Sequence, residues 1–186
     1  MVDEFCGSPC VLVLMGVSGS GKSTIADELA KRLHWNYEDG DRFHPKSNVE
    51  KMSAGHPLTD EDRWPWLQAI ADEIDRICDA GDHAIITCSA LKHAYREILV
   101  HGRKDVRIIY LNGTRELIAG RLAKRKDHFM PAALLESQFK TLEPPVPAED
   151  PITVSIDGSV EAIVDHIIQS LKLGPAERRA IGGNSA

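Results

Sequence analysis

The sequence predicts an α/β fold built around a parallel β-sheet. Apolar runs of strand length alternate with segments of helical period, which is typical of strands joined by crossover helices. Three runs, at residues 11–15, 84–86 and 106–111, are nearly continuous in apolar residues, as expected for strands buried on both faces. The chain has 186 residues, of which 42% are hydrophobic and 27% charged, so it can form one domain with a full core.

Five strands are expected in chain order, at residues 11–15, 35–39, 84–88, 106–111 and 152–156. A helix at residues 24–33 follows the first strand, and another with an apolar stripe runs from Val160 to Leu171. We expect one domain over residues 1–173. The polar, glycine-containing tail at residues 174–186 is expected to fray.

The longest predicted helix begins after Thr59, where Thr59 and Asp62 have the spacing of a capping box. Apolar residues then recur at three-to-four spacing as far as Cys78, and Gly81 is expected to end the helix. Pro65 is placed in the first turn, where a missing backbone N–H does little harm. Trp66 fits the core stripe, whereas Trp64 is expected to face solvent or a partner.

Two polar stretches interrupt the alternation of strands and helices. One insertion, at about residues 42–62, mixes His, Pro, Asn, Lys and Gly before the long helix. The other, at about residues 124–147, is basic at its start and rich in proline at its end. Long polar insertions in a compact domain usually bind ligands or cover sites. We therefore expect a substrate-binding segment in the first stretch and a mobile lid in the second.

The chain is acidic, with 22 Lys and Arg against 28 Asp and Glu and a formal net charge of −6. This balance argues against broad binding to nucleic acid or to a membrane surface. No apolar run approaches the length that spans a bilayer, and the acidic start does not resemble a signal peptide. The four cysteines, Cys6, Cys10, Cys78 and Cys88, have no zinc-like spacing. We expect reduced thiols and a cytoplasmic location.

Residues 16–23 match the phosphate-binding motif G-x-x-x-x-G-K-[ST] at every defined position. A buried strand precedes the motif and an amphipathic helix follows it, which is the context that its chemistry requires. Its glycines let consecutive N–H groups point at a phosphate, the lysine reaches the β- and γ-phosphates, and the serine hydroxyl holds Mg²⁺. The nucleotide-binding residues predicted here are Gly16, Ser18, Gly19, Ser20, Gly21, Lys22, Ser23 and Thr24. The motif predicts a P-loop NTPase-type three-layer α/β/α fold with a nucleotide-binding site.

Two carboxylates follow the second predicted strand, in the run Asp39-Gly40-Asp41. Because the carboxyl ends of parallel strands line one crevice, both are expected to face the phosphate loop. One carboxylate can hold Mg²⁺ and the other can act as general base toward a hydroxyl of a small acceptor. The alternative is a simple turn, since Asp-Gly is common in turns.

These residues and several later ones together resemble the gluconokinases, small P-loop carbohydrate kinases related to shikimate kinase. The resemblance covers residues 10–171 in order and spacing. Beside the phosphate loop and Asp39-Gly40-Asp41, its most specific part is Cys88-Ser89-Ala90-Leu91-Lys92. Further matching positions are His44, Pro45, Asn48, Lys51, Met52, Gly55, Pro57, Leu58, Asp60, Asp62, Arg63, Pro65, Trp66, Leu67, Tyr95, Arg96, Arg121, Arg125, His128, Phe129, Gln138, Phe139, Leu142 and Glu143.

The resemblance implies ATP-dependent phosphorylation of D-gluconate to 6-phosphogluconate with Mg²⁺, a sheet of strand order 2-3-1-4-5 and a homodimer. It implies that Ser23 and Asp39 serve the metal and that Asp41 is the acceptor base, although which aspartate does which stays open. Arg121 and Arg125, one helical turn apart, would sit at the base of the lid and contact the phosphates. Without the resemblance, a solvated helix face is the favoured explanation of both arginines.

The implied acceptor is an anion with many hydroxyls, so it needs a cation and several fixed polar groups. The candidates near the crevice are His44, Lys51, Arg63, Lys92 and Arg96. Arg63 is the first choice because a guanidinium contacts a carboxylate through two N–H groups. Arg63 could instead pair with Asp60 or Asp62 at the helix start, and His44 could cap the next helix.

Two other functions fit the phosphate loop. A shikimate or nucleotide kinase shares the architecture, but a shikimate kinase would show a glycine triplet where this chain has Cys88-Ser89-Ala90. A nucleotide-dependent switch would leave the paired aspartates without a purpose, and the Asn-Lys-x-Asp motif of GTPase switches is missing from the sequence.

Overall fold

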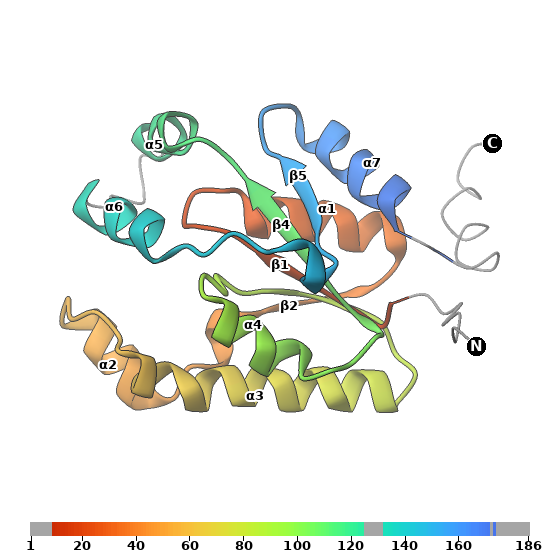
Figure 1. Cartoon of the computed structure of the whole chain (residues 1–186), viewed down its shortest axis with the longest axis horizontal. Coiled ribbons are helices and arrows are strands. Elements are labelled where there is room, and N and C mark those ends of the chain that lie inside the picture. The colour runs from red at the N-terminus through yellow and green to blue at the C-terminus, as the bar shows by residue number, and fades with distance from the viewer. Residues whose placement is uncertain (1–8, 125–131, 172, 174–186) are drawn as a thin grey trace.

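A computed structural model of the chain describes residues 9–124, 132–171 and 173. Its five strands are all parallel and form one sheet in the order β2-β3-β1-β4-β5, which confirms the predicted topology (Figure 1). The strands are β1 Val11–Met15, β2 Asn36–Asp39, β3 Ala84–Thr87, β4 Val106–Asn112 and β5 Ile152–Ser155. The α-helices among the described residues are α1 Lys22–Leu33, α2 Lys46–Ser53, α3 Asp60–Asp79, α4 His93–Val100, α5 Arg115–Ala123, α6 Ala132–Thr141 and α7 Val160–Ser170. Two short 3₁₀ helices are η1 Gly40–Phe43 and η2 Pro147–Glu149.

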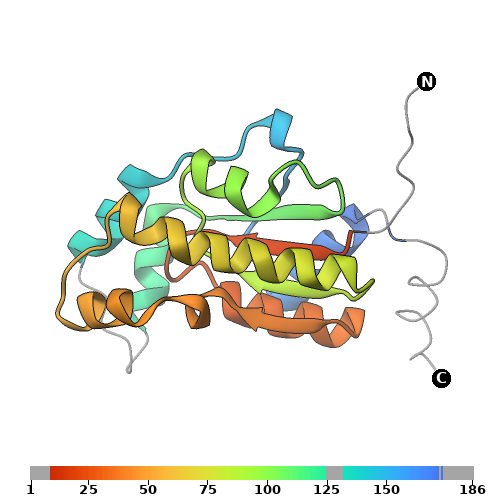
Figure 2. The same ribbon diagram turned by 90° about the horizontal axis from the view of Figure 1, so that it is seen from below.

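The sheet lies between two layers of helices, and each layer closes its own core (Figures 1 and 2). Successive side chains of β1 point to opposite faces, so Leu12 and Leu14 pack with α1 and α7 while Val11, Val13 and Met15 pack with α3 and α4. Every residue of β1 is fully buried, as the continuous apolar run predicted.

Most differences from the predicted elements are shifts of one or two residues at their ends. Trp35 is not part of β2, because its N–H donates to the Ala30 carbonyl at the end of α1 and its ring stacks on His83 with 4.7 Å between ring centroids. The helix predicted at residues 24–33 begins at Lys22, directly after the phosphate loop.

The long helix α3 begins where the capping box predicted. The Thr59 hydroxyl accepts from the Asp62 N–H, and the Asp62 carboxylate accepts from the Thr59 N–H. The placement of Pro65 in the first turn is wrong, since Pro65 is the sixth residue of α3. The expectation for Trp64 is also wrong, because its ring packs edge-on against Tyr95 at 5.5 Å and is half-buried, whereas Trp66 lies in the core as predicted.

The first polar insertion folds as η1 and α2, and α6 lies in the second. Residues 125–131, which include Arg125 and His128, lie outside the described residues, as does the tail at 174–186. In the part of the chain that the structure describes, no helix is long and apolar enough to cross a membrane.

Gly40, where β2 ends and η1 begins, lies very close to the backbone of the neighbouring strand β3. A Cβ atom added at this position would lie 2.2 Å from the Thr87 carbonyl oxygen of β3. The Gly40 carbonyl in turn accepts a hydrogen bond of 2.8 Å from the buried Trp66 indole. Only glycine fits between the two aspartates because the backbones of two strands meet there.

We expect Gly40→Ala to lower the free energy of unfolding by about 1–3 kcal/mol, the usual cost of overpacking a tight site. Urea denaturation followed by circular dichroism measures this loss. Gly120→Ala is the matched control, since a Cβ at Gly120 in α5 meets nothing within 4 Å and alanine favours a helix. Equal stability of the two variants would contradict the steric role of Gly40.

Candidate functional site

The loop between β1 and α1 has the backbone of a phosphate cradle. Gly19 and Gly21 adopt left-handed φ angles of +82° and +93°, and Gly21 is the N-cap of α1. Because α1 begins at Lys22, its N-terminal dipole and free N–H groups face the same space as the loop. The hydroxyls of Ser23 and Thr24, in the first turn of α1, are exposed there.

Lys22 folds back across this loop. Its ammonium donates to the carbonyl oxygens of Gly16 at 2.9 Å and of Val17 at 3.2 Å. Desolvation lowers the pKa of Lys22, while the nearby charges of Asp41 and Asp39 oppose that shift. The charge of Lys22 therefore interacts with those of both aspartates, which the sequence predicted to face the phosphate loop.

Gln138 of α6 caps the phosphate loop from the other side. Its side-chain oxygen accepts a hydrogen bond of 2.7 Å from the Ser18 N–H, and its side-chain nitrogen donates to the Ser18 hydroxyl at 3.0 Å. Sequence reasoning assigned no role to Gln138. In the sequence, Gln138 stood out only as one of the positions at 138–143 that resemble the family. That resemblance does not indicate a contact with Ser18, 120 residues away.

Within the described part of the chain, the carboxylates of Asp39 and Asp41 contact neutral donors or a histidine. The Asp39 carboxylate accepts from the Asp41 N–H at 3.0 Å and from the Thr87 hydroxyl at 3.4 Å. The Asp41 side chain is 79% exposed and lies 3.9 Å from the His44 ring. Among the described residues, neither aspartate has a Lys or Arg partner within 4.0 Å. Their negative charge is free to meet a cation or a proton.

His44 is held as a neutral ring next to Asp41. It stacks on Trp66, with 4.0 Å between ring centroids, and burial lowers its pKa. The Asn48 amide nitrogen can only donate, so His44 Nδ1, 3.3 Å away, accepts and the ring proton lies on Nε2. His44 does not cap α2, whose N-cap is Pro45. Its Nε2–H faces the Asp41 carboxylate.

Lys51 and Lys92 are both ion-paired to the first turn of α3. Lys51 donates to Asp62 at 2.5 Å and lowers the pKa of Asp62 to about 2. Lys92 contacts both oxygens of Asp60 at 2.7 and 2.9 Å, and the Tyr95 hydroxyl donates to the same carboxylate. Each amine is therefore already neutralised, which leaves it less suited to bind an acceptor carboxylate.

Arg63 keeps most of its guanidinium available. One nitrogen, Nη1, donates to the Leu58 carbonyl at 2.9 Å and to the Tyr95 hydroxyl at 3.4 Å. The predicted alternative, an ion pair with Asp60, reaches only 4.0 Å. The positive charge of Arg63 also helps to lower the pKa of His44, after the larger effect of burial.

Arg96 is not available to a substrate, so its prediction as a substrate ligand is wrong. Its side chain is only 2% exposed. Its Nε and Nη2 donate to the two carboxylate oxygens of Glu149, at 2.6 and 3.1 Å. Its Nη1 donates to the carbonyls of Ala90 and Leu91. Arg96 therefore connects η2 to the loop after β3. Its two hydrogen bonds to the Glu149 carboxylate offset the free-energy cost of burying the guanidinium charge.

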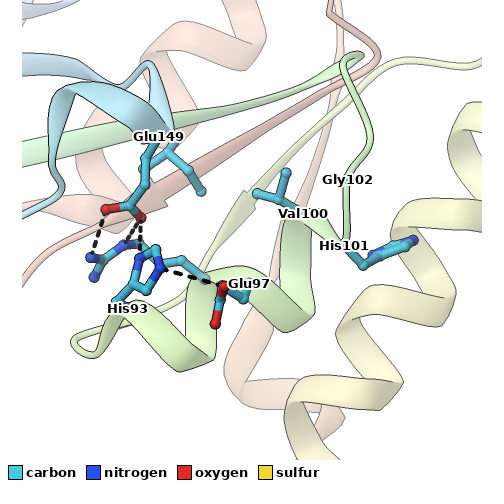
Figure 3. A pocket seen from close by; sticks show the side chains of 8 residues that line it. His93, Glu97, Val100, His101, Gly102 and Glu149 are labelled. Atoms are coloured by element: carbon cyan, nitrogen blue, oxygen red, sulfur yellow. Dashed lines mark hydrogen bonds and ion pairs between the residues drawn. The ribbon is translucent and has the colours of Figure 1, made fainter.

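Glu149 also borders a separate cavity of 270 Å³ on the outer side of α4. Figure 3 shows His93 between the carboxylates of Glu149 and Glu97, at 3.3 and 3.5 Å. The ion pairs at this cavity, of Glu149 with Arg96 and His93 and of His93 with Glu97, belong to the packing of α4 against η2. The phosphate loop does not line the cavity.

A second cavity, of 280 Å³, extends from the phosphate loop between α1 and α7. Apolar side chains of Ile25, Val160 and Ile163 line one part of it, and the cations Arg121 and Lys124 line another. Arg121 is oriented by a hydrogen bond of 2.5 Å from its Nη2 to the Ile156 carbonyl. The structure thus brings Arg121 to the loop, as predicted.

The chain is similar along most of its length to named kinases. A family model described as an AAA domain matches residues 11–145. The thermoresistant gluconokinase of Escherichia coli (strain K12) is 45% identical over 165 residues, which cover 88% of this chain and 94% of that protein. An unliganded sugar kinase from Janibacter sp. HTCC2649 has a TM-score of 0.83 at 44% identity and covers 91% of this chain and 98% of its own.

A second solved structure, a gluconokinase from Sinorhizobium meliloti 1021, has a TM-score of 0.80 at 34% identity over 96% of this chain and 99% of its own. The matches span the phosphate loop, the paired aspartates and the helices that carry the other site groups. The chain belongs to the gluconokinase family of P-loop kinases.

Proposed function

We propose that this chain transfers the γ-phosphoryl group of ATP to D-gluconate and forms 6-phosphogluconate. The observation that carries the proposal is the pairing of a phosphate loop with two carboxylates, at one edge of the sheet, that have no Lys or Arg within 4.0 Å in the described ranges. A nucleotide-binding loop alone does not specify an acceptor, whereas Asp39, Asp41 and Arg63 add a metal ligand, a base and a cation within the same crevice.

ATP fits the loop and the cavity beside it. The phosphates would lie on the loop N–H groups and at the N-terminus of α1, with Lys22 leaving the carbonyls of Gly16 and Val17 to contact them. The apolar side chains of Ile25, Val160 and Ile163 provide a surface for the base. Arg121 is placed to contact phosphate oxygens, and Arg125 is proposed to join it as a catalytic cation on the transferring group.

Mg²⁺ suits the oxygen groups at this edge. Ser23 offers an exposed hydroxyl, and Asp39 offers a carboxylate whose described donors are uncharged. Magnesium bound there would neutralise charge on the phosphates during transfer. We propose Ser23 and Asp39 as its protein ligands.

Asp41 is proposed as the general base. Its carboxylate takes the proton of the acceptor's 6-hydroxyl as that oxygen bonds to the γ-phosphorus. The bond from the γ-phosphorus to the bridging oxygen breaks at the same centre, and ADP leaves with the electron pair. The neutral His44 ring supports this role, because its Nε2–H lies 3.9 Å from the Asp41 carboxylate.

The acceptor carboxylate is assigned to Arg63, whose guanidinium keeps N–H groups that the described residues do not use. Lys51 and Lys92 are proposed to shape the substrate segment through Asp62 and Asp60, and they remain second candidates for contacts to hydroxyls. The lid expected at about residues 124–147 would exclude water from the transfer, since ATP would otherwise be hydrolysed.

Family membership disfavours the two other functions considered from the sequence, a shikimate or nucleotide kinase and a nucleotide-dependent switch. A homodimer and a cytoplasmic location complete the proposal and rest on the family resemblance. Sedimentation equilibrium at several concentrations measures the oligomeric state, and imaging of a fluorescent fusion tests the location.

ADP release in the presence of a panel of sugar acids and polyols tests the function directly. We expect gluconate to stimulate release well above the rate seen with ATP and Mg²⁺ alone. Hydrolysis that does not depend on any acceptor would support the switch instead. Equal stimulation by an uncharged polyol would contradict the need for a carboxylate-binding cation.

We expect Asp41→Asn to lower kcat by about 100-fold or more, because loss of a general base has this scale, while ATP affinity stays nearly unchanged. Steady-state kinetics with gluconate and a fluorescent ATP analogue measure the two quantities. Asp27→Asn is the matched control, since Asp27 lies on the exposed face of α1 and pairs only with Lys31 among the described residues. Retained turnover in Asp41→Asn would remove Asp41 from the base role.

We expect Arg63→Ala to raise the KM for gluconate by about 10- to 100-fold, the scale of a lost charge-assisted contact, with little change in the KM for ATP. Arg76→Ala is the matched control in the same helix, because Arg76 is exposed and pairs with Glu73. A change confined to the ATP parameters would show that the carboxylate binds elsewhere.

A further inference from the structure

Two thiols and a carboxylate meet at the amino ends of the strands, at the opposite edge of the sheet from the phosphate loop. Cys10 and Asp105 immediately precede β1 and β4, and Cys78 is the next-to-last residue of α3. Both views show that end of α3 close to where β1 and β4 begin (Figures 1 and 2). The sequence shows no metal-binding spacing, because the three residues come from segments far apart in the chain.

The distances within this group suit one metal ion. The two sulfur atoms and a carboxylate oxygen all lie within 4.8 Å of one another, and Cys10 Sγ lies 3.5 Å from Asp105 Oδ2. Tetrahedral zinc with bonds of about 2.3 Å to sulfur and about 2.1 Å to oxygen separates such ligands by about 3.6 Å, and two sulfurs by about 3.8 Å. Binding therefore needs only a small inward shift of the side chains.

The backbone and one arginine hold the ligands in place. The Asp105 carbonyl accepts from the N–H groups of Cys10 and Val11 at 2.7 and 3.3 Å, so the loops carrying two of the ligands are fixed to each other. Arg103 donates to both oxygens of Asp105, at 2.9 and 3.0 Å, and orients the carboxylate. The arginine also offsets the charge of a site made of two thiolates and a carboxylate around a divalent cation.

The two thiols are poor candidates for a redox pair. Burial raises the pKa of Cys10 and raises that of Cys78 to about 12. Thiol–disulfide exchange proceeds through the thiolate, so neutral thiols of this kind exchange slowly. A soft metal ion acts differently, because it displaces the thiol protons as it binds.

We propose that Cys10, Cys78 and Asp105 form a structural site for one divalent cation of the zinc class, with water as the fourth ligand. The cation would join the start of β1, the end of α3 and the start of β4. It would stabilise the fold at the edge remote from phosphoryl transfer, so the site is independent of the proposed function.

Cobalt titration of the reduced, chelator-washed full chain tests the site, because cobalt replaces zinc and thiolate ligands give it a strong near-ultraviolet charge-transfer band. We expect one equivalent per chain to produce the band and zinc to abolish it. Cobalt at the oxygen ligands Ser23 and Asp39 gives no such band, so the two metal sites are distinguishable. A Cys6→Ser background limits the signal to the other three cysteines.

We expect Cys10→Ser and Cys78→Ser to lose the band, and Asp105→Asn to keep a weaker band with an affinity lowered by about 10-fold or more. Cys88→Ser is the matched control, because Cys88 is buried at the other edge of the sheet. Zinc should also raise the Tm of the parent chain but not of Cys78→Ser. Circular dichroism confirms that each variant is folded.

Two results would overturn the proposal. One is a reduced, folded parent chain that develops no thiolate–cobalt band at saturating cobalt, a measurement that needs no variant. The other is a band that persists at full strength in both Cys10→Ser and Cys78→Ser.

Discussion

Complete burial of β1 is the constraint on which the rest of the structure depends. The strand pairs in parallel with β3 on one side and β4 on the other, so its end cannot shift without breaking both ladders. Because β2 pairs in parallel with β3, Asp39 is in register with Thr87 at the carboxyl ends of the two strands. The phosphate loop and the paired aspartates therefore meet because of sheet register, and Gly40 allows the turn between them to pass the Thr87 carbonyl.

Charge at the site is arranged in two ways that serve different purposes. The carboxylates of Asp60 and Asp62 are neutralised by Lys92 and Lys51, which stabilises the start of α3 and the segment before it. Asp39 and Asp41 have no such partners among the described residues. A net charge of −6 gives no long-range attraction for anionic substrates. The loop dipoles, Lys22, Arg63 and Arg121 must therefore act at short range.

Local patterns predicted most of the fold, and contacts between distant segments explain what they missed. The apolar run of β1, the phosphate motif and the capping box each depend on neighbours in the chain, so the sequence contains them in full. Lys92 and Arg96 looked alike in the sequence because both follow β3. Only the fold brings Asp60 to one and Glu149 to the other, and this pairing decides that Arg96 is structural.

Gln138 shows how such a distant contact links binding to the position of a helix. Its side-chain oxygen accepts a hydrogen bond from the Ser18 N–H. This N–H belongs to the phosphate loop, where it would otherwise be available to a phosphate oxygen. A phosphate oxygen that claims this donor must displace the Gln138 amide. Glu143 lies five residues after Gln138, just beyond the end of α6. Its N–H donates to the Leu91 carbonyl, and its carboxylate accepts from the His93 N–H. These two contacts hold Glu143 to the loop after β3, whereas Gln138 contacts the phosphate loop. The segment formed by α6 and the residues after it therefore touches both the nucleotide side of the site and the segment that carries Lys92.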